Sequence, residues 1–195
     1  MSKGALTRQA ILHHGVEVAY HVGLGGLSIS TLAAGTGMSK SGLFAHFGSK
    51  ESLQLEVLAQ ARSEFVDTVI RPALAVRRGE PRVRVLFEQW LASGRARLPG
   101  GCLFVKAATE FDEQAGPVRD QLVRDHRDLY DSIAQIFRTG IAEGHFRADA
   151  DPEQFAADLD GVMLAFYHAN RLLEDPAAET RARNAFEALL GAARA

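Results

Sequence analysis

The sequence predicts an all-α protein, and three observations support this fold class. Apolar residues recur at helical spacing, no segment sustains the period-2 alternation of a strand, and glycine or proline clusters separate the helical segments. A chain of 195 residues can bury enough surface to form a core without a disulfide or a metal. Its single cysteine, Cys102, cannot form an intrachain disulfide, which is typical of proteins from a reducing compartment.

The first two helices are predicted from their apolar phase and their end signals. The first begins near Thr7 and ends at the glycine-rich segment 23–26. Its apolar side consists of Ile11, Gly15, Val18, Ala19 and Val22. Ser28 is a plausible N-cap for a short second helix. The apolar residues of that second helix are Ile29, Leu32 and Ala33.

The third and fourth helices follow a break at Gly37. Ser39 offers a new N-cap, and we expect Leu43, Phe44 and Phe47 to form the buried side of the third helix. After a turn at Gly48 and Ser49, Ser49 can cap a long helix that stops near Pro72.

The rest of the chain is also predicted to be helical. Glycine and proline separate five further segments, and in two of them an aspartate precedes a proline that takes the first helical position. The segments are residues 82–97, 103–111, 117–143, 152–174 and 177–192. The prediction is therefore about nine helices and no sheet.

Residues 28–47 have the pattern of a helix-turn-helix. Gly37 lies in the tight turn, where a residue without Cβ can take positive φ. The second helix of the pair is short, and its start carries small polar residues. Such a helix fits the major groove of DNA, where its N-terminal end reaches the base edges. The alternative is a helical hairpin that only packs against its neighbours.

The N-terminal part of the chain resembles the TetR family of transcriptional regulators. The resemblance covers about residues 7–60 and is carried by an ordered series of residues: Arg8, Ile11, Gly26, Leu32, Ala33, Gly37–Lys40, Leu43, Phe44, His46, Phe47 and Ser49–Leu53. It implies a homodimeric regulator, usually a repressor, that a small molecule releases from its operator. It also implies a DNA-binding domain at residues 1–53 and a ligand-binding and dimerisation domain at residues 54–195.

The resemblance also implies which residues meet DNA. Phe44 stands where the family usually has a tyrosine, and Gly42 stands where threonine or serine is common, so two hydroxyl contacts are missing. Lys50 has the help of the positive end of the fourth helix in binding a phosphate. The expected DNA-binding residues are Ser28, Ser30, Thr31, Ser39, Lys40, Ser41, Gly42, Phe44, His46 and Lys50.

Small residues recur every four positions in segment 152–174, which lets another helix approach closely. These residues are Ala157, Gly161, Ala165 and Ala169. We expect half of a dimer interface here, completed by Phe186 and Leu190 of the last helix, because dimers of the family use their last two long helices. Ordinary packing within one chain is the alternative.

A ligand pocket is expected in the central part of the chain, because aromatic and polar residues of the kind that line such pockets are concentrated there. The expected lining residues are Trp90, Cys102, Phe104, His126, Tyr130 and Phe166. The alternative for His126 is a satisfied core histidine on an apolar helix face. A redox role for Cys102 would need an accessible, low-pKa thiolate, whereas its neighbours Leu103 and Phe104 indicate burial.

Charge and motif content narrow the class of protein. Residues 1–50 carry four basic residues against one acidic residue, a net charge of +3 in a chain of net charge −2, which is compatible with docking one end against phosphates. An enzyme is the first rival, but no nucleophile elbow, phosphate loop or metal-binding histidine pair is present to support it. The second rival is an architectural or purely activating DNA-bound protein, which would share the helix-turn-helix and would not need an aromatic cavity. We expect a cytoplasmic protein without cofactor, metal or membrane partner, bound to double-stranded DNA, a small-molecule effector and a second copy of itself.

Overall fold

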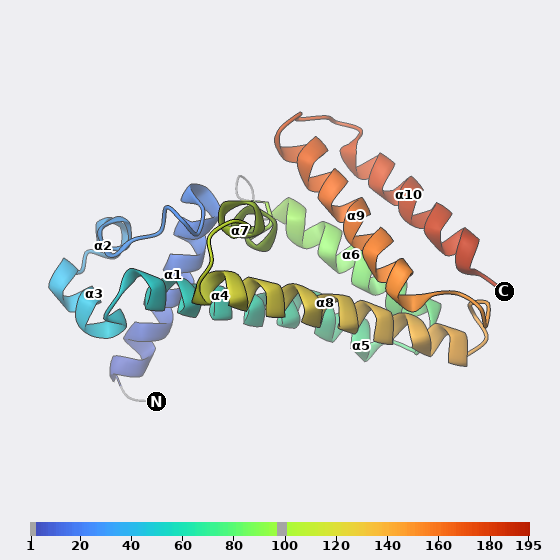
Figure 1. Ribbon diagram of the computed structural model, residues 1–195, viewed down its shortest axis with the longest axis horizontal. Helices are drawn as coiled ribbons and strands as arrows, with labels where there is room; N and C mark the ends of the chain where they lie inside the picture. Colours follow the sequence, from blue (N-terminus) through green and yellow to red (C-terminus); the bar gives the residue numbers. More distant parts are fainter. Residues whose placement is uncertain (1–2, 97–100) are drawn as a thin grey trace. The chain divides into compact units, whose positions relative to one another are not determined.

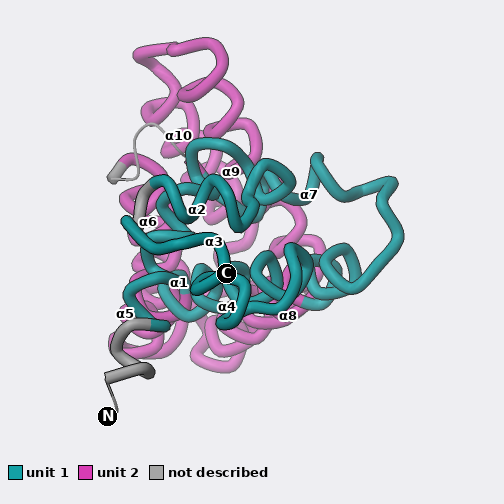
Figure 2. Tube along the Cα trace, turned by 90° about the vertical axis from the view of Figure 1, so that its left-hand side faces the viewer, with its two compact units in different colours: residues 1–65, 102–124 teal, residues 66–101, 125–195 magenta. Residues whose placement is uncertain are grey.

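The computed structural model describes residues 3–96 and 101–195; the side chains of residues 3–7, 35, 36 and 96 lie outside this description. The chain divides into two compact units (Figure 2), residues 1–65 with 102–124 and residues 66–101 with 125–195. The described residues form ten α-helices and one π-helical segment, with no named strand among them. No described helix is long and apolar enough to cross a membrane.

Unit 1 contains the N-terminal helices (Figure 1). They are α1 (Lys3–Val22), α2 (Ile29–Thr36), α3 (Lys40–Phe47) and α4 (Lys50–Phe65). The helix α7 (Leu103–Phe111) and the first residues of α8 (Pro117–Ala142) belong to the same unit. Its core is continuous from Ile11 in α1 through Leu32 and Leu43 to Leu58 in α4 and Leu103 in α7. Burial of these aliphatic side chains supplies the main stabilising free energy of the unit.

The predicted long helix at 50–71 is interrupted. α4 ends at Phe65, a π-helical segment covers Val66–Ile70, and α5 (Arg71–Ala75) follows with Pro72 in its first turn. Proline is tolerated in a first turn because its missing N–H has no partner there. Counted as one continuous stretch, these three elements bring the described helices to the nine that were predicted, and the all-α fold class is confirmed.

Unit 2 contains α6 (Glu80–Ala96), the rest of α8, α9 (Pro152–Arg171) and α10 (Ala178–Ala193). α9 and α10 lie side by side (Figure 1). The core is rich in stacked rings: Phe87 of α6 stacks on Phe186 of α10 with ring centroids 4.0 Å apart, and Phe137 stacks on Phe146 at 4.4 Å. Such ring pairs stabilise the core beyond the area that they bury.

Ion pairs join α6 to α10 along the surface of unit 2. Arg84 binds Glu187 through two bonds of 2.6 and 3.0 Å, and Arg194 binds Glu80 through bonds of 2.6 and 3.0 Å. The Arg194 guanidinium, with help from Arg84, holds the pKa of the Glu80 carboxyl at about 2. A second group of ion pairs joins the same two helices farther along. Arg95 of α6 binds Glu179 of α10, and Arg183 of α10 binds both Glu179 and Glu88 of α6.

Candidate DNA-binding site

The helix-turn-helix is held by side-chain caps at the predicted positions. Ser28 is the N-cap of α2: its hydroxyl accepts from the Thr31 N–H, and the Thr31 hydroxyl accepts from the Ser28 N–H. Gly37 ends α2 in the left-handed region with φ 66°. Ser39 is the N-cap of α3 and accepts from the Gly42 N–H at 3.1 Å. The caps satisfy N–H groups that a helix start leaves without an intrahelical partner.

Arg8 of α1 fixes the orientation of α3. Its guanidinium donates to the Glu56 carboxylate of α4 at 2.7 Å and to the carbonyl oxygen of His46 at 3.4 Å. It also lies over the ring of Phe47, 5.4 Å from the ring centroid. One side chain therefore links three helices of unit 1. Sequence reasoning gave Arg8 no role, although the residue stood in the family resemblance.

The loop between α1 and α2 is bound by α7. The Lys106 ammonium donates to the carbonyl oxygens of Tyr20 and His21 at 2.9 and 3.1 Å, which satisfies the end of α1. The Glu110 carboxylate accepts from the Gly25 N–H at 2.7 Å. We call Lys106, Glu110 and their backbone partners the α7 clamp. No sequence pattern predicts this clamp, because the partners of both side chains are backbone groups some 85 residues away.

The same loop is bound from α4. Lys50 donates to the carbonyl oxygen of Gly25 at 2.6 Å, and the buried Gln54 donates to that of Leu24 at 2.7 Å. Both backbone polar groups of Gly25, its N–H and its carbonyl oxygen, are therefore held by charged side chains from two different helices. The loop leads directly into Ser28, so these contacts set where α2 begins.

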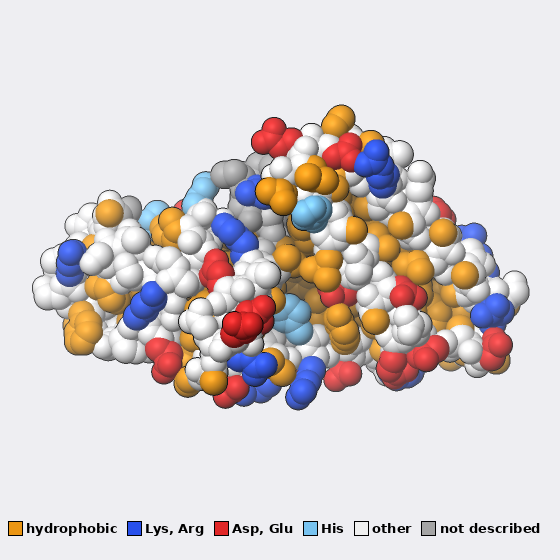
Figure 3. Space-filling model, turned by 45° about the horizontal axis from the view of Figure 1, so that its top comes forward, with side chains coloured by type: hydrophobic (Ala, Val, Ile, Leu, Met, Phe, Trp, Pro, Cys, Tyr) orange, Lys and Arg blue, Asp and Glu red, His pale blue; other side chains and the backbone are white. Residues whose placement is uncertain are grey.

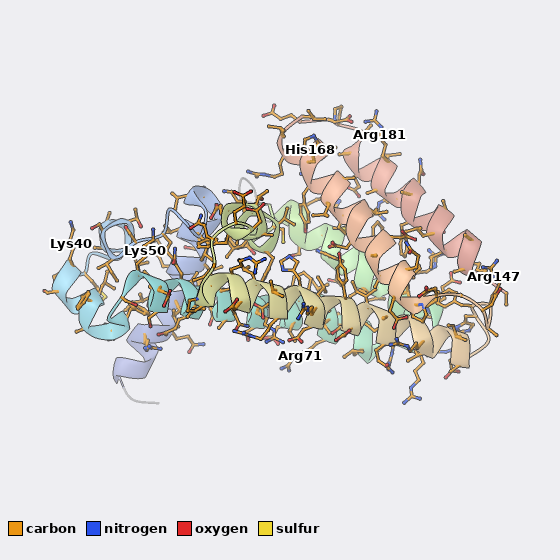
Figure 4. The ribbon with its side chains drawn as sticks, in the orientation of Figure 1. Lys40, Lys50, Arg71, Arg147, His168 and Arg181 are labelled. Atoms are coloured by element: carbon orange, nitrogen blue, oxygen red, sulfur yellow. The ribbon has the colours of Figure 1, made fainter. Side chains whose placement is uncertain are left out.

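The expected DNA-binding residues come together at one end of unit 1. Figure 4 labels Lys40 and Lys50 at the starts of α3 and α4. Three of them are half-buried: Ser28, Gly42 and His46. The other seven are exposed: Ser30, Thr31, Ser39, Lys40, Ser41, Phe44 and Lys50. The prediction that Phe44 belongs to the buried side of α3 is wrong, because its side chain is 57% exposed while Leu43 and Phe47 are buried. In a helix of eight residues two apolar positions suffice to seat it.

Four of the expected pocket residues lie in unit 2. Trp90 and Phe166 are buried, and a Cβ at Gly94, one turn after Trp90, would lie 3.2 Å from the Phe166 ring. The Tyr130 hydroxyl donates to the Asp160 carboxylate at 2.8 Å. Burial raises the pKa of the Asp160 carboxyl, and His126 acts on that carboxylate electrostatically in the opposite direction. The remaining two, Cys102 and Phe104, are half-buried residues of unit 1.

The expected dimer residues divide into two groups. Ala157, Gly161 and Ala165 are exposed on α9, with Ala169 half-buried. Phe186 and Leu190 are buried inside unit 2, where Phe186 stacks on Phe87, so their side chains are part of the protomer core and are not on its surface. The exposed Leu164 lies on the same face of α9 as the three small residues. Hydrophobic side chains gather in this part of the molecule in Figure 3.

An all-helical protein with a capped helix-turn-helix and lysines at the exposed helix starts is a DNA-binding protein of the helix-turn-helix class. Two family models match the chain: "Bacterial regulatory proteins, tetR family" over residues 11–57 and "Tetracyclin repressor-like, C-terminal domain" over residues 79–186. The second alone covers more than half of the chain, which therefore belongs to the TetR family of transcriptional regulators. The family consists of DNA-binding regulators that are not enzymes and that respond to small-molecule ligands, typically as dimers.

Solved structures agree with this fold. A TetR transcriptional regulator from Chloroflexus aurantiacus is 24% identical with a TM-score of 0.86, covering 98% of this chain and 96% of its own. A TetR-family regulator from Cytophaga hutchinsonii is 19% identical with a TM-score of 0.87, covering 100% and 98%. AibR, solved in complex with isovaleryl coenzyme A and operator DNA, is 20% identical with a TM-score of 0.74, covering 94% and 97%. No curated protein matches the chain.

Proposed function

We propose that this protein is a repressor that binds a palindromic operator as a homodimer and leaves it when a small ligand occupies unit 2. The observation that carries the DNA-binding part is the start of α3, where the Ser39 cap presents exposed Lys40 and Ser41. A helix start of this kind reaches base edges in the major groove. AibR, a structural relative, was solved with operator DNA, which supports the same docking for this chain.

Lys50 is the proposed phosphate contact. In the protein without DNA, the ammonium group of Lys50 donates to the carbonyl oxygen of Gly25. An ammonium group has three donors, so Lys50 can bind a phosphate oxygen and keep its bond to Gly25. A phosphate contact carries no direct base information. Lys50→Ala should therefore weaken binding almost equally on the operator and on a scrambled duplex. Lys40→Ala should weaken binding mainly on the operator, because Lys40 reaches bases.

The test is fluorescence anisotropy with both duplexes at one fixed salt concentration. The operator is first obtained by selection from a randomised duplex library with the full-length protein. Arg71→Ala, on the exposed surface of α5, is the matched control for loss of one positive charge. Unchanged affinity in both lysine variants would refute this assignment of the DNA-binding surface.

The face of α9 that carries Ala157, Gly161, Leu164 and Ala165 is the proposed dimer contact. These four positions are exposed and apolar. A Cβ at Gly161 would meet nothing within 4 Å in the protomer, so the close approach that this glycine permits is available to a second copy. Two copies joined here would present two α3 helices to one operator, with half-sites about 34–36 Å apart.

The proposed effector is an apolar or aromatic molecule with one hydrogen-bond donor. Trp90 and Phe166 are buried aromatic side chains of unit 2, and ligand sites are mostly apolar with a few placed polar groups. The Tyr130 hydroxyl uses its proton on Asp160, so the oxygen of Tyr130 is left to accept from a ligand. A neutral amine, amide or alcohol on an aromatic ring meets this requirement, whereas an ether or ketone in the same place does not.

Thermal stabilisation tests the effector proposal. A panel of aromatic compounds is compared in donor-bearing and donor-free pairs, and active compounds are then tested for release of the operator. Donor-bearing members should raise the melting temperature of the protein, and Asp160→Asn should reduce their advantage. An effector can shift the DNA-binding equilibrium only if it binds the DNA-free form more tightly. Operator binding that no stabilising compound alters would favour a purely architectural or activating protein.

A further inference from the structure

The outward face of α3 carries an exposed aromatic ring that the protomer does not use. Phe44 is 57% exposed, although Leu43 and Phe47 on either side of it are buried. Burying a phenylalanine side chain stabilises a protein, so leaving this ring in water forgoes a stabilising contact. The ring occupies the middle of the helix that a helix-turn-helix protein inserts into the major groove.

The neighbours of Phe44 on this face are small and offer few hydrogen-bonding groups. Ser41, Phe44 and Ala45 are exposed and follow one another at the i, i+3, i+4 spacing of one helix face. The Ser41 hydroxyl lies 3.2 Å from the hydroxyl of the Ser39 cap. The sequence of α3, KSGLFAHF, contains no arginine, asparagine or glutamine, and Lys40 at its start is its one residue of the kind that reads guanine or adenine through hydrogen bonds.

The helix that presents this face is held firmly. Arg8 lies over the Phe47 ring and binds both the His46 carbonyl oxygen and Glu56. The caps at Ser39 and Gly48 close both ends of α3. The orientation of the helix face that carries Phe44 is therefore set by the fold of unit 1, as a site that reads DNA sequence requires.

Thymine is the base that such a face can read. In the major groove the apolar group presented by a base is the C5-methyl of thymine, and phenylalanine and alanine side chains are among those that contact it. We infer that Phe44, with Ala45, reads thymine methyl groups in each half-site, so that the operator is specified at these positions by apolar contact. This inference rests on the proposed operator binding and names the base that the exposed face recognises.

The basic flank of the face selects DNA as its occupant over another protein. Lys40 precedes the face on α3 and Lys50 lies at the start of α4, and residues 1–50 carry a net charge of +3. An apolar strip between cations matches a groove in which methyl groups lie between phosphate backbones.

Replacing thymine by deoxyuridine tests the inference, because it removes only the methyl group and keeps the hydrogen-bonding edges. Each thymine of the selected operator is replaced in turn, and affinity is measured with the full-length protein at one salt concentration. At one or two positions per half-site, loss of a methyl should weaken binding about fourfold, and loss in both half-sites about 15-fold. Phe44→Ala should weaken binding to the thymine operator and lose the discrimination, whereas Phe44→Leu should keep part of it.

Leu74→Ala is the matched control, since it truncates another exposed apolar side chain, 46% exposed and outside unit 1. Because Phe44 is exposed, Phe44→Ala should melt at the wild-type temperature. Affinity that changes less than twofold at every deoxyuridine position would overturn the inference and leave operator binding standing. An altered self-association of Phe44→Ala with unchanged DNA affinity would overturn it in favour of a protein contact. Selection of no DNA sequence would overturn this inference and the proposed function together.

Discussion

The α7 clamp makes a quantitative prediction about Glu110. Its carboxylate accepts from the Gly25 N–H at 2.7 Å and is half-buried. Hydrogen bonds to charged groups contribute about 1.5–3 kcal/mol, and the partial exposure places this one at the low end, about 1.5 kcal/mol. In a chain of this size each kcal/mol shifts the melting temperature by about 2–4 °C. Glu110→Ala should therefore lower the melting temperature by about 3–6 °C.

The same variant should weaken operator binding. Gly25 lies in the loop that leads to Ser28, so freeing its N–H lets α2 begin in more than one place and lowers the fraction of molecules that fit the groove. Glu110→Gln keeps an acceptor without the charge and should fall between the wild type and Glu110→Ala in both assays.

Differential scanning fluorimetry and anisotropy with the selected operator provide the two measurements. Glu113→Ala is the matched control, because Glu113 is an exposed acid just beyond the end of α7. A melting temperature of Glu110→Ala within 1 °C of that of Glu113→Ala would refute the assignment of free energy to the clamp. Equal operator affinity in the two variants would refute the coupling to α2.

Three further predictions concern other parts of the chain. Gly161→Leu should shift the protein from dimer to monomer in light scattering, whereas Ala142→Leu, on the exposed end of α8, should leave it a dimer; two dimeric variants would refute the α9 contact. The folded-state pKa of Glu80 is about 2 against an ordinary value of 4.5, so its stabilising contribution is present above about pH 4.5 and is lost as the pH falls toward 2; Glu80→Gln should flatten this part of a plot of melting temperature against pH. Gly23→Ala combines positive φ with a Cβ 1.9 Å from Glu110, whereas Gly144→Ala has positive φ and open space, so Gly23→Ala should lower the melting temperature more; an equal loss would show that only the backbone matters.

Local signals in the sequence predicted the helix-turn-helix well. Ser28, Gly37 and Ser39 act through backbone groups within three residues of themselves, and such contacts are written in short sequence patterns. Phe44 was misassigned because a helix of two turns has too few positions for its apolar phase to separate a buried ring from an exposed one.

Contacts between distant residues could not be predicted in the same way. Glu110 binds a backbone N–H, which every residue except proline possesses, so no residue type identifies its partner. Asp160 was missed for a related reason: one acid on an apolar helix face is common, and only the fold brings the Tyr130 hydroxyl to it. The end of α4 at Phe65 also has no glycine or proline to announce it.

The ion pairs between α6 and α10 affect how salt titrations of this protein should be interpreted. The four residues of one group are at least partly exposed: Arg84, Glu187, Glu80 and Arg194. At physiological ionic strength, charges on such exposed groups are screened over about 8 Å. Added salt therefore weakens the attachment of α10, the helix packed beside α9, over the same concentrations at which it displaces the protein from phosphates. For the proposed dimer, the slope of operator affinity against salt then contains a contribution from unit 2, and the number of phosphate contacts is obtained only after the salt dependence of dimerisation has been subtracted.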